Sequence, residues 1–429
     1  MHLVYNLLLY LYFILALPLL LFKFLTGKAT QVKEQLGFLP RTLLHVLENQ
    51  TVIWVHGVSV GETVAASPIC AEIRKQFPHV KIVFSTVTTT GRTMAEKLIP
   101  ADAFIYFPFD LPMVVKKVLT QIKPVLVVIM ETELWPNLIK TANHMGIKVV
   151  LANGRISERS FRRYRLLGSY FRDMLRRMDA LIMQSMQDVD YALALGAEKK
   201  RVYYFGNTKY DLKILPHAPG KEETFQKELQ LGKVSPILVV GSTHDNEEEL
   251  FISIYKRLKA EFPDLVMILA PRHPDRVKEI EPLYKKAGIP TVRRTELAHT
   301  RREAAVIFID TIGELLAAYR LADLVFVGGS LVKFGGHNIL EPAVYGRPIF
   351  VGPYMDDFKD ILGLFLNNDA CIQVQDHNEL AEKMLYYLKH PVEAELKGRN
   401  ALRIVEENQG AAEKVVDLLA GFIPESPAG

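Results

Sequence analysis

The chain has few cysteines and a small net charge, and each of these facts argues against certain classes of protein. It contains only Cys70 and Cys371 among 429 residues. The two are far apart and lack metal-type spacing, so we expect neither a disulfide framework nor a zinc site, and sparse cysteine fits a reducing cytoplasm. The formal net charge is only +4 at pH 7. That balance does not indicate a protein that binds nucleic acid.

Two common nucleotide-binding signatures are also missing. The chain has no Walker lysine motif and no Gly-x-Gly-x-x-Gly at the head of its first half, which argues against a P-loop or a dinucleotide enzyme. Asp188 and Asp190 form the Asp-x-Asp string of metal-dependent nucleotide-sugar enzymes. They open a helix-like stretch after Ser185, however, where acidic side chains are ordinary capping residues. We therefore predict no metal and no cofactor.

Charged residues are absent from residues 3–22. At 1.5 Å per residue this apolar run is long enough to cross a hydrocarbon core of about 30 Å. It predicts an N-terminal membrane anchor helix over residues 1–26. Lys23, Lys28 and Lys33 follow the run instead of preceding it, which disfavours a cleaved signal peptide and places the later residues in the cytoplasm. A buried core helix is the alternative.

Arginines gather between residues 155 and 177, where they alternate with aromatic and aliphatic side chains. Such a mixture is typical of a helix that lies on an anionic membrane surface, and a solvated helix face is the alternative. The arginines are Arg159, Arg162, Arg163, Arg165, Arg172, Arg176 and Arg177.

Short apolar runs alternate with amphipathic stretches along most of the chain, a pattern typical of parallel sheets covered by helices on both faces. A length of 429 residues also exceeds one ordinary core. The strand-like runs of the first half are residues 51–57, 81–87, 103–107, 124–130, 147–152 and 180–183. Those of the second half are residues 237–240, 265–270, 306–309, 324–327 and 348–351.

The alternation is interrupted after residue 212 by prolines, glycines and mixed charges, which indicate a linker. The predicted fold class is therefore α/β, with two doubly wound Rossmann-like domains and an N-terminal anchor. The predicted parts are an anchor over residues 1–26, a first domain over 27–212, a linker over 213–235 and a second domain over 236–429.

Ligands of open α/β sheets bind beyond the carboxyl ends of the strands, so the residues that follow each strand are the candidates for chemistry. Glu62 lies in the first turn of a helix, where the helix dipole favours its ionised form and makes it a candidate base. The alternative is that it only stabilises the start of that helix. Glu131 and Glu133 directly follow an apolar strand. They are candidate cleft carboxylates, and a helix-start role competes for them too.

The second half offers groups that suit an anion. Backbone N–H groups of the glycine-rich run 328–342 are expected to cradle a phosphate. Arg272 and His273 stand between two prolines at a strand end, where they could stack on a base or pair with a phosphate, unless they only form a turn. A base in one half and a phosphate cradle in the other suggest group transfer from a phosphate-linked donor.

Eight motifs are distributed along the chain. They are residues 54–56 (WVH), 59–62 (SVGE), 130–137 (METELWPN), 153–157 (NGRIS), 206–211 (GNTKYD), 241–244 (GSTH), 271–274 (PRHP) and 335–342 (GGHNILEP). These motifs resemble those of the 3-deoxy-D-manno-octulosonic acid (Kdo) transferases, membrane-bound enzymes of lipopolysaccharide biosynthesis with the glycosyltransferase-B fold. The resemblance runs from the N-terminal helix to near the C-terminus.

The resemblance implies an inverting glycosyltransferase that moves Kdo from CMP-Kdo to a lipid A precursor at the cytoplasmic face of the cell inner membrane. It makes Glu62 the general base, and it gives Glu131 and Lys209 the positions that stabilise the transition state. The CMP-sugar site that it implies, with no metal, consists of Pro271, Arg272, Ile312, Gly313, Glu314, Gly335, Gly336, Asn338, Ile339, Leu340 and Glu341.

The chain departs from the family pattern at two places. Gly57 stands where the family commonly has alanine or serine, and Asp245-Asn246-Glu247 replaces a glutamate-glycine-glutamate sequence. Two other functions remain as alternatives. One is a glycosyltransferase-B relative or sugar-nucleotide epimerase that uses another nucleotide, and the other is a non-enzymatic protein that binds anionic lipid.

Overall fold

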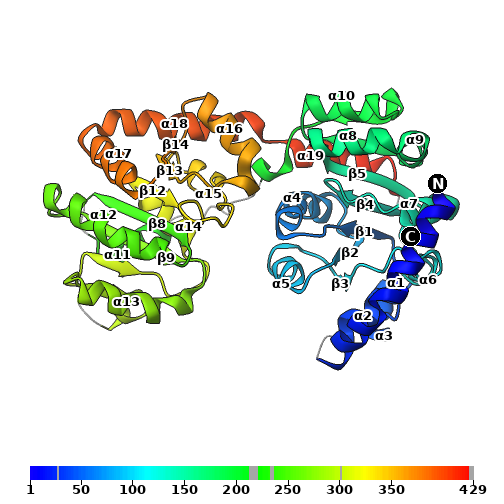
Figure 1. Cartoon of the computed structure of the whole chain (residues 1–429), viewed down its shortest axis with the longest axis horizontal. Helices are drawn as coiled ribbons and strands as arrows, with labels where there is room; N and C mark the ends of the chain where they lie inside the picture. Colours follow the sequence, from blue (N-terminus) through cyan, green and yellow to red (C-terminus); the bar gives the residue numbers. More distant parts are fainter. Residues whose placement is uncertain (27–28, 212–220, 232–235, 300–301, 425–429) are drawn as a thin grey trace. The chain divides into compact units, whose positions relative to one another are not determined.

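The computed structural model describes all residues except 27–28, 212–220, 232–235, 300–301 and 425–429 (Figure 1). The chain divides into two compact units, each an α/β fold with one parallel sheet. Unit 1 comprises Met1–Leu212 and Asn408–Gly429, and unit 2 comprises Lys213–Glu407. The division therefore falls where the linker was predicted to begin. The prediction that the second domain runs to residue 429 is wrong, because the last residues return to unit 1.

The sheet of unit 1 has seven parallel strands in the order β3-β2-β1-β4-β5-β6-β7. Its direction of growth reverses between β1 and β4, and such a switch point is where doubly wound sheets bind ligands. All residues of these two central strands are buried, which explains their unbroken apolar character. The strands are β1 (Val52–His56), β2 (Lys81–Thr86), β3 (Ala103–Tyr106), β4 (Leu126–Met130), β5 (Lys148–Gly154), β6 (Ala180–Met183) and β7 (Val202–Tyr204).

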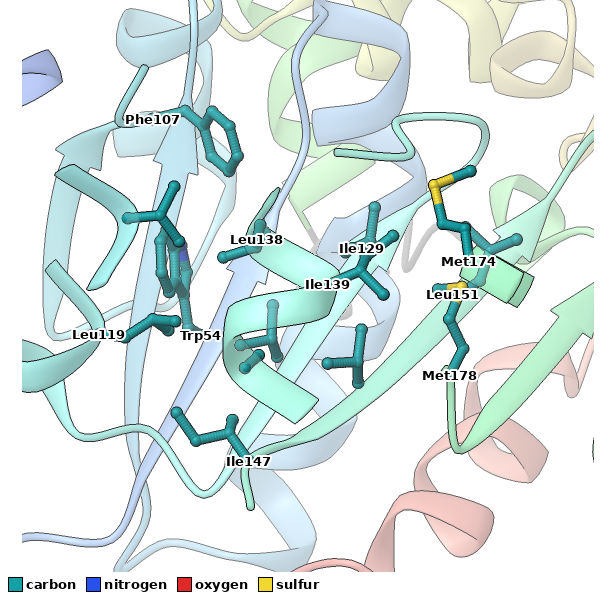
Figure 2. Packing of buried hydrophobic residues seen from close by; sticks show 14 of the residues in the cluster. Trp54, Phe107, Leu119, Ile129, Leu138, Ile139, Ile147, Leu151, Met174 and Met178 are labelled. Carbon is teal, nitrogen blue, oxygen red and sulfur yellow. The ribbon is translucent and has the colours of Figure 1, made fainter. Parts of the chain in front are cut away.

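Helices cover both faces of this sheet. One face packs on α6, α7 and α9, as Figure 2 shows for Trp54 of β1 beside Leu138 and Ile139 of α7. The other face packs on α4, α5 and α19. The helices of unit 1 are α1 (His2–Leu25), α2 (Ala29–Gln35), α3 (Arg41–Leu47), α4 (Val60–Gln76), α5 (Thr89–Leu98), α6 (Pro112–Ile122), α7 (Pro136–His144), α8 (Glu158–Leu166), α9 (Gly168–Arg176), α10 (Met186–Ala194) and α19 (Ala411–Ala420).

Helix α19 explains why the chain returns to unit 1. Its apolar residues, among them Val415, Val416 and Leu419, are buried in the core of the α4 face. The carboxylate of Asp211 accepts hydrogen bonds from the backbone N–H groups of Gly410 (2.5 Å) and Ala412 (2.6 Å) at the start of this helix. An acceptor there satisfies amides that a helix cannot pair internally.

Helix α1, dark blue in Figure 1, is fixed to unit 1 by polar side chains near its start. The Tyr5 hydroxyl donates to Asp110 (2.9 Å), and the Asn137 amide donates to Asn6 (2.7 Å). Phe13 packs edge-on against Phe109 with 5.3 Å between ring centroids. In the part of the chain that the structure describes, no helix combines the length and apolarity needed to cross a membrane. The membrane-spanning anchor predicted over residues 1–26 is therefore not supported by the structure.

The sheet of unit 2 also has seven parallel strands, in the order β10-β11-β9-β8-β12-β13-β14, with a switch point between β8 and β12. Its strands are β8 (Ile237–Thr243), β9 (Val266–Pro271), β10 (Thr291–Arg293), β11 (Val306–Phe308), β12 (Leu324–Val327), β13 (Ile349–Val351) and β14 (Ile372–Gln373). Its helices are α11 (Lys221–Glu228), α12 (Glu247–Glu261), α13 (Val277–Lys286), α14 (Leu315–Leu321), α15 (Leu340–Ala343), α16 (Lys359–Asn367), α17 (His377–Lys389) and α18 (Pro391–Asn408).

The predicted linker over residues 213–235 lies largely outside the described residues. Its described part contains α11, which is held against unit 2. Phe225 is buried, and Glu228 forms an ion pair with Arg294. This part of the chain is thus a packed helix.

Candidate functional site

Glu62 lies one turn into α4, directly after the central strand β1. Ser59 is the N-cap residue, and its hydroxyl oxygen accepts a hydrogen bond from the Glu62 N–H (3.3 Å). In return, the Glu62 carboxylate accepts bonds from the Val58 N–H (2.6 Å) and the Ser59 hydroxyl (3.3 Å). This arrangement resembles a capping box, except that the Glu62 carboxylate bonds the N–H of Val58, one residue before the N-cap, so the helix-start role considered from the sequence is present.

Glu131 and Lys209 meet beyond the neighbouring central strand. Glu131 is the first residue after β4 and has a φ of 53°, a left-handed conformation that a side chain other than glycine rarely adopts. Lys209 Nζ lies 2.8 Å from its carboxylate. A Cβ atom at Gly61 would lie 3.9 Å from the same Lys209 Nζ, so this lysine also approaches the start of α4. The structure thus brings the three predicted catalytic residues, Glu62, Glu131 and Lys209, to one switch point.

The environment raises the pKa of Glu62 to about 7. Burial is the largest cause, and the carboxylates of Glu133 and Glu131 add to it, against the opposing hydrogen bond from the Val58 N–H. The expectation that the helix dipole holds this group ionised is therefore wrong in direction. Burial and two like charges outweigh the dipole here. A carboxyl whose pKa lies near neutral pH is well suited to act as a general base.

Glu133 also lies at this site. Burial and the charge of Glu131 raise its pKa. The charges of both Glu131 and Glu133 therefore raise the pKa of Glu62. Glu131 differs from Glu133 in its ion pair with Lys209.

Lys209 is positioned by residues that the sequence did not single out. It belongs to the 3-10 helix η2 (Thr208–Asp211). The Thr208 N–H donates to the side chain of Asn153 (3.0 Å), and the Thr208 hydroxyl donates to the Ala65 carbonyl of α4 (2.7 Å). Asn153 and Thr208 belong to the motifs 153–157 and 206–211, so these motifs could have identified them from the sequence. They connect Lys209 to the helix that bears Glu62.

In unit 2, the first part of the glycine-rich run binds an internal carboxylate. Glu247, which is fully buried at the start of α12, accepts hydrogen bonds from the N–H groups of Gly329 (2.7 Å), Ser330 (3.0 Å) and Leu331 (2.9 Å). It also accepts one from the His244 N–H (3.0 Å). The prediction that this run as a whole cradles a phosphate is therefore wrong for these amides, because a carboxylate of the protein already occupies them.

The second part of the run is tightly packed around Gly335 and Gly336. Both have positive φ values, 106° and 80°. A Cβ atom at Gly336 would lie 2.2 Å from the sulfur of Met355, and one at Gly335 would lie 2.9 Å from a carboxylate oxygen of Asp357. Glycine is therefore required at both positions.

Asn338 and Glu341 interact just beyond these glycines. The Asn338 side chain accepts a hydrogen bond from the Leu340 N–H (3.1 Å). Burial raises the pKa of Glu341 to about 7, against the opposing effects of a hydrogen bond with Asn338 and the charge of Arg272. Ile339 and Leu340 are buried. Of the predicted donor-site residues, these two can therefore offer a ligand mainly their backbone.

Arg272 is surrounded by histidines that the sequence did not mark as functional. Pro271 ends β9, and the Arg272 N–H donates to the Thr243 carbonyl of β8 (3.0 Å). The ring nitrogens Nε2 of His244 and His337 lie 2.8 Å apart. Burial, together with the charge of Arg272, lowers the pKa of His244 to about 4 and that of His337 to about 3. Arg272 is thus the positive charge that acts on this cluster and on Glu341.

The remaining predicted donor-site residues lie in the loop before α14. Ile312 is 80% exposed, and Gly313 has a φ of 94°. The Glu314 carboxylate pairs with Arg294 (3.1 Å) and accepts a hydrogen bond from Thr311. Glu314 is therefore already engaged by protein groups.

Asp188, the first residue of the Asp-x-Asp string, has a structural role. Its carboxylate accepts hydrogen bonds from the Ile156 N–H (2.6 Å) and from the Ser185 hydroxyl at the start of α10. Among the described residues, no group of three or more acidic, histidine or cysteine side chains is arranged to hold a metal ion.

Sequence comparison gives consistent matches. A family model described as 3-deoxy-D-manno-octulosonic-acid transferase (kdotransferase) matches residues 30–212. A 3-deoxy-D-manno-octulosonic acid transferase of Haemophilus influenzae is 32% identical over 373 residues, covering 86% of this chain and 87% of that protein. One from Chlamydophila psittaci is 30% identical over 420 residues, covering 96% of this chain and 94% of that protein.

Two solved structures share the overall fold. A UDP-GlcNAc 2-epimerase from Neisseria meningitidis has a TM-score of 0.59 and 16% identity, covering 87% of this chain and all of that chain. A glycosyltransferase from Rickettsia africae has a TM-score of 0.55 and 15% identity, covering 88% of this chain and all of that chain. Two parallel-sheet α/β domains of this kind are consistent with the glycosyltransferase-B fold.

Proposed function

Because the chain belongs to the family of 3-deoxy-D-manno-octulosonic acid transferases and is thus a glycosyltransferase, we propose that it moves Kdo from CMP-Kdo to a lipid A precursor with inversion of configuration. One observation supports the mechanism most directly. Glu62 is a buried carboxyl beyond β1 whose pKa lies near 7 because of burial and two neighbouring carboxylates. A group of this kind can accept a proton at neutral pH.

In the proposed reaction, Glu62 takes the proton from an acceptor hydroxyl while the hydroxyl oxygen attacks the anomeric carbon of Kdo. The new carbon–oxygen bond forms on one face of the sugar. The bond to the phosphate oxygen of CMP breaks on the opposite face, and CMP leaves with the bonding electrons. CMP is a good leaving group that requires no proton donor. The ion pair of Lys209 with Glu131 keeps a positive charge beside the base, where it can offset developing negative charge.

We assign the CMP moiety to unit 2. Arg272 supplies the positive charge for the leaving phosphate, and the backbone N–H groups of Gly335 and Asn338 supply uncharged donors, without a metal. The N–H of Gly336 already donates to the Gly329 carbonyl (2.8 Å), so Gly336 contributes the compact loop conformation and no donor. Glu341 can accept hydrogen bonds from the ribose hydroxyls, assisted by Asn338. Calorimetry with CMP and UDP distinguishes this assignment from a UDP-dependent relative with the same fold, because only CMP should bind.

The proposal is tested by replacing Glu62 with glutamine. Turnover should fall by roughly 10²–10⁴-fold, the usual contribution of a general base. A carboxyl with a raised folded-state pKa favours folding most below pH 4.5, where it is protonated, and loses that contribution as pH rises through 7. The neutral amide should therefore leave the protein at least as stable at pH 8. Mass spectrometry of a lipid A precursor incubated with freshly generated CMP-Kdo measures the turnover.

The exposed Glu48→Gln is the matched control for this experiment and should transfer Kdo like the wild type. A Glu62→Gln variant that keeps half the wild-type rate would contradict the assignment of the base. A wild-type protein that binds CMP but adds no Kdo mass would contradict the acceptor.

We also propose that unit 1 rests on the cytoplasmic face of the inner membrane. Leu3, Leu7, Leu11 and Leu15 recur every four residues on the exposed face of α1. Helix α9, with the exposed Arg172 and Arg176, lies beside its start, where Tyr170 contacts the rings of His2 and Tyr5. Helix α8, with the exposed Arg162 and Arg163, packs on α9 through Tyr164 and Phe171. An apolar stripe beside arginines suits anionic lipid.

Flotation with vesicles tests the lipid contact. The protein should float with vesicles that contain anionic lipid and much less with neutral ones, because each surface arginine contributes about 1 kcal/mol to binding anionic membranes. The double variant Arg162→Gln, Arg163→Gln should float less. Equal flotation with neutral vesicles would remove the arginines from the proposal.

A further inference from the structure

A chain of buried polar side chains lies on the sheet of unit 1, and the proposed mechanism does not use it. The indole N–H of Trp54 in β1 donates to the Ser85 hydroxyl oxygen in β2 (2.8 Å). His56 Nδ1 lies 2.8 Å from the same oxygen. The indole N–H of Trp135 donates to His56 Nε2 (3.2 Å). The two tryptophans of the protein are thus the two ends of one hydrogen-bonded chain.

These contacts fix the state of His56. An indole nitrogen can only donate, so His56 Nε2 must accept, and the ring proton therefore resides on Nδ1, from which it is donated to Ser85. His56 is fully buried, and burial lowers its pKa to about 3. Protonation of Nε2 would also remove the acceptor that Trp135 uses. The ring is therefore a neutral connector of defined tautomer at neutral pH.

Ring contacts hold Trp135 in the same place. His56 stacks on Phe107 with 3.8 Å between centroids, and Phe107 lies 4.9 Å from the Trp135 ring. The Phe107 and Trp54 rings, both labelled in Figure 2, have 6.0 Å between their centroids. An apolar ring at position 56 could pack on Phe107 equally well. It would leave the partly buried indole donor of Trp135 without its protein partner, which is costly. The histidine thus fixes the orientation of the Trp135 indole through a hydrogen bond, which packing alone would not do.

Trp135 ends the short segment that carries both acidic neighbours of Glu62. The segment leaves β4 at Met130, and its first residue, Glu131, has the left-handed backbone conformation. Within it the Leu134 N–H donates to the Thr132 carbonyl (2.9 Å). Helix α7 then begins at Pro136. The segment 131–135 is therefore tied to the sheet at one end and to His56 at the other.

We propose that His56, through its hydrogen bond to Trp135, is a positioning residue that holds segment 131–135 in the conformation in which Glu131 and Glu133 flank Glu62. It touches neither substrate nor reacting atoms. The inference rests on the proposed function, because it requires Glu62 to be the base. Three charged groups face Glu62 in this arrangement, namely the carboxylates of Glu131 and Glu133 and, through its pair with Glu131, the ammonium of Lys209.

Two tryptophan variants separate positioning from packing. Trp135→Phe keeps an aromatic ring at the end of the segment and removes the donor to His56, together with some ring volume that the Trp54 variant also loses. Trp54→Phe is the matched control, because it removes the donor at the other end of the chain and leaves the bond between His56 and Trp135. The measurements are kcat, KM for CMP-Kdo and the pH dependence of kcat/KM, on full-length protein whose fold is verified by near-ultraviolet circular dichroism.

We expect Trp135→Phe to lower kcat about tenfold with little change in KM, and to move the acidic limb of the pH profile from near 7 toward the ordinary glutamate range. The limb should move because the two carboxylates no longer stay close to Glu62. Trp54→Phe should keep the wild-type limb even if its melting temperature falls. His56→Gln, which retains an acceptor for Trp135, should keep more activity than His56→Phe.

The positioning role would be overturned if Trp135→Phe kept the acidic limb of the wild-type pH profile. It would also be overturned if Trp54→Phe shifted that limb as much as Trp135→Phe does. The proposed function fails separately, since a Glu62→Gln variant with wild-type turnover would contradict the base whatever the tryptophan variants do. If His56→Phe does not fold, Trp135→Phe and its control still decide the question.

Discussion

At the scale of single residues, Glu62 combines a structural role at the start of α4 with the proposed chemical role of a base. Its carboxylate closes the start of α4 through the Val58 N–H and the Ser59 hydroxyl. The same bonds fix its direction, while burial and its two acidic neighbours bring its pKa close to neutral. The two roles weighed from the sequence therefore do not exclude each other, because the capping bonds also orient the carboxylate that we propose as the base.

The pH dependence of the reaction follows from the pKa of Glu62. The base must be deprotonated to accept a proton, so kcat/KM should rise with pH through about 7 and level off above it. Glutamine at position 133 removes one of the charges that raise the pKa, so Glu133→Gln should move the rise to lower pH. Initial rates between pH 5 and 9 measure both. A rise that stays below pH 5 in the wild type would show that another group limits the reaction.

The sequence identified residues of the candidate site that the structure brings together, but not their electrostatics. Glu62, Glu131 and Lys209 were each recognisable from motifs, and the structure brings them together. The pKa of Glu62 is raised by burial and by the carboxylates of Glu131 and Glu133, which follow another strand, β4. Neither cause is visible in a local motif. The occupation of the glycine-rich run by Glu247 was missed for the same reason, since the partners are about 80 residues apart in the chain.

Both departures from the family pattern have a physical explanation. Asn246 has a φ of 74°, which glycine adopts freely and asparagine tolerates better than most residues. It can therefore replace the family glycine at the start of α12. A Cβ atom at Gly57 would lie 3.3 Å from the Cβ of Glu62. The glycine of this chain thus relieves a close contact beside the base.

At the scale of elements, the sequence predicted the central strands and the edge strand β3, and it missed three short strands at the other sheet edges. Eleven strand-like runs correspond to strands of the two sheets. The strands that were not predicted are β7, β10 and β14, which all lie at sheet edges and have only two or three residues. A central parallel strand needs an unbroken apolar run because both of its faces are covered, whereas an edge strand this short leaves no such pattern.

At the scale of elements, substitution of Asp211 tests how much its cap on α19 contributes to stability. Its carboxylate satisfies two N–H groups at the start of α19, and α19 completes one face of the unit 1 core. Asp211→Ala should lower the free energy of unfolding by about 1–2 kcal/mol, as loss of a helix cap does. Urea denaturation followed by tryptophan fluorescence reports on unit 1, since Trp54 and Trp135 both belong to it. An unchanged midpoint would mean that solvent replaces the cap at no cost.

At the scale of the whole molecule, unit 1 is built from two separate stretches of chain. Residues 1–212 form its sheet, and the residues from 408 onward add α19. The sequence predicted the first boundary because prolines and glycines mark it. It did not predict the return, because an amphipathic helix at the end of a chain does not reveal which core it joins.

A fragment of residues 1–212 should therefore be poorly folded. Without α19, its core exposes the apolar surface of α4, including Ile69 and Ile73, which the helix covers in the intact chain. A fragment in which residues 408–424 are joined to residue 212 by a flexible linker should regain a cooperative melting transition. Circular dichroism of both fragments measures this. Equal cooperativity would show that α19 is dispensable for folding.

The divided construction of unit 1 also sets an order of events during synthesis. The ribosome makes roughly 200 residues between the two stretches of this unit, which takes on the order of 10–40 s at ordinary elongation rates. Unit 2 is synthesised during that interval, while the α4 face of unit 1 waits for its last helix. Chaperones that recognise exposed apolar surface should therefore associate with the nascent N-terminal half and leave only after translation ends.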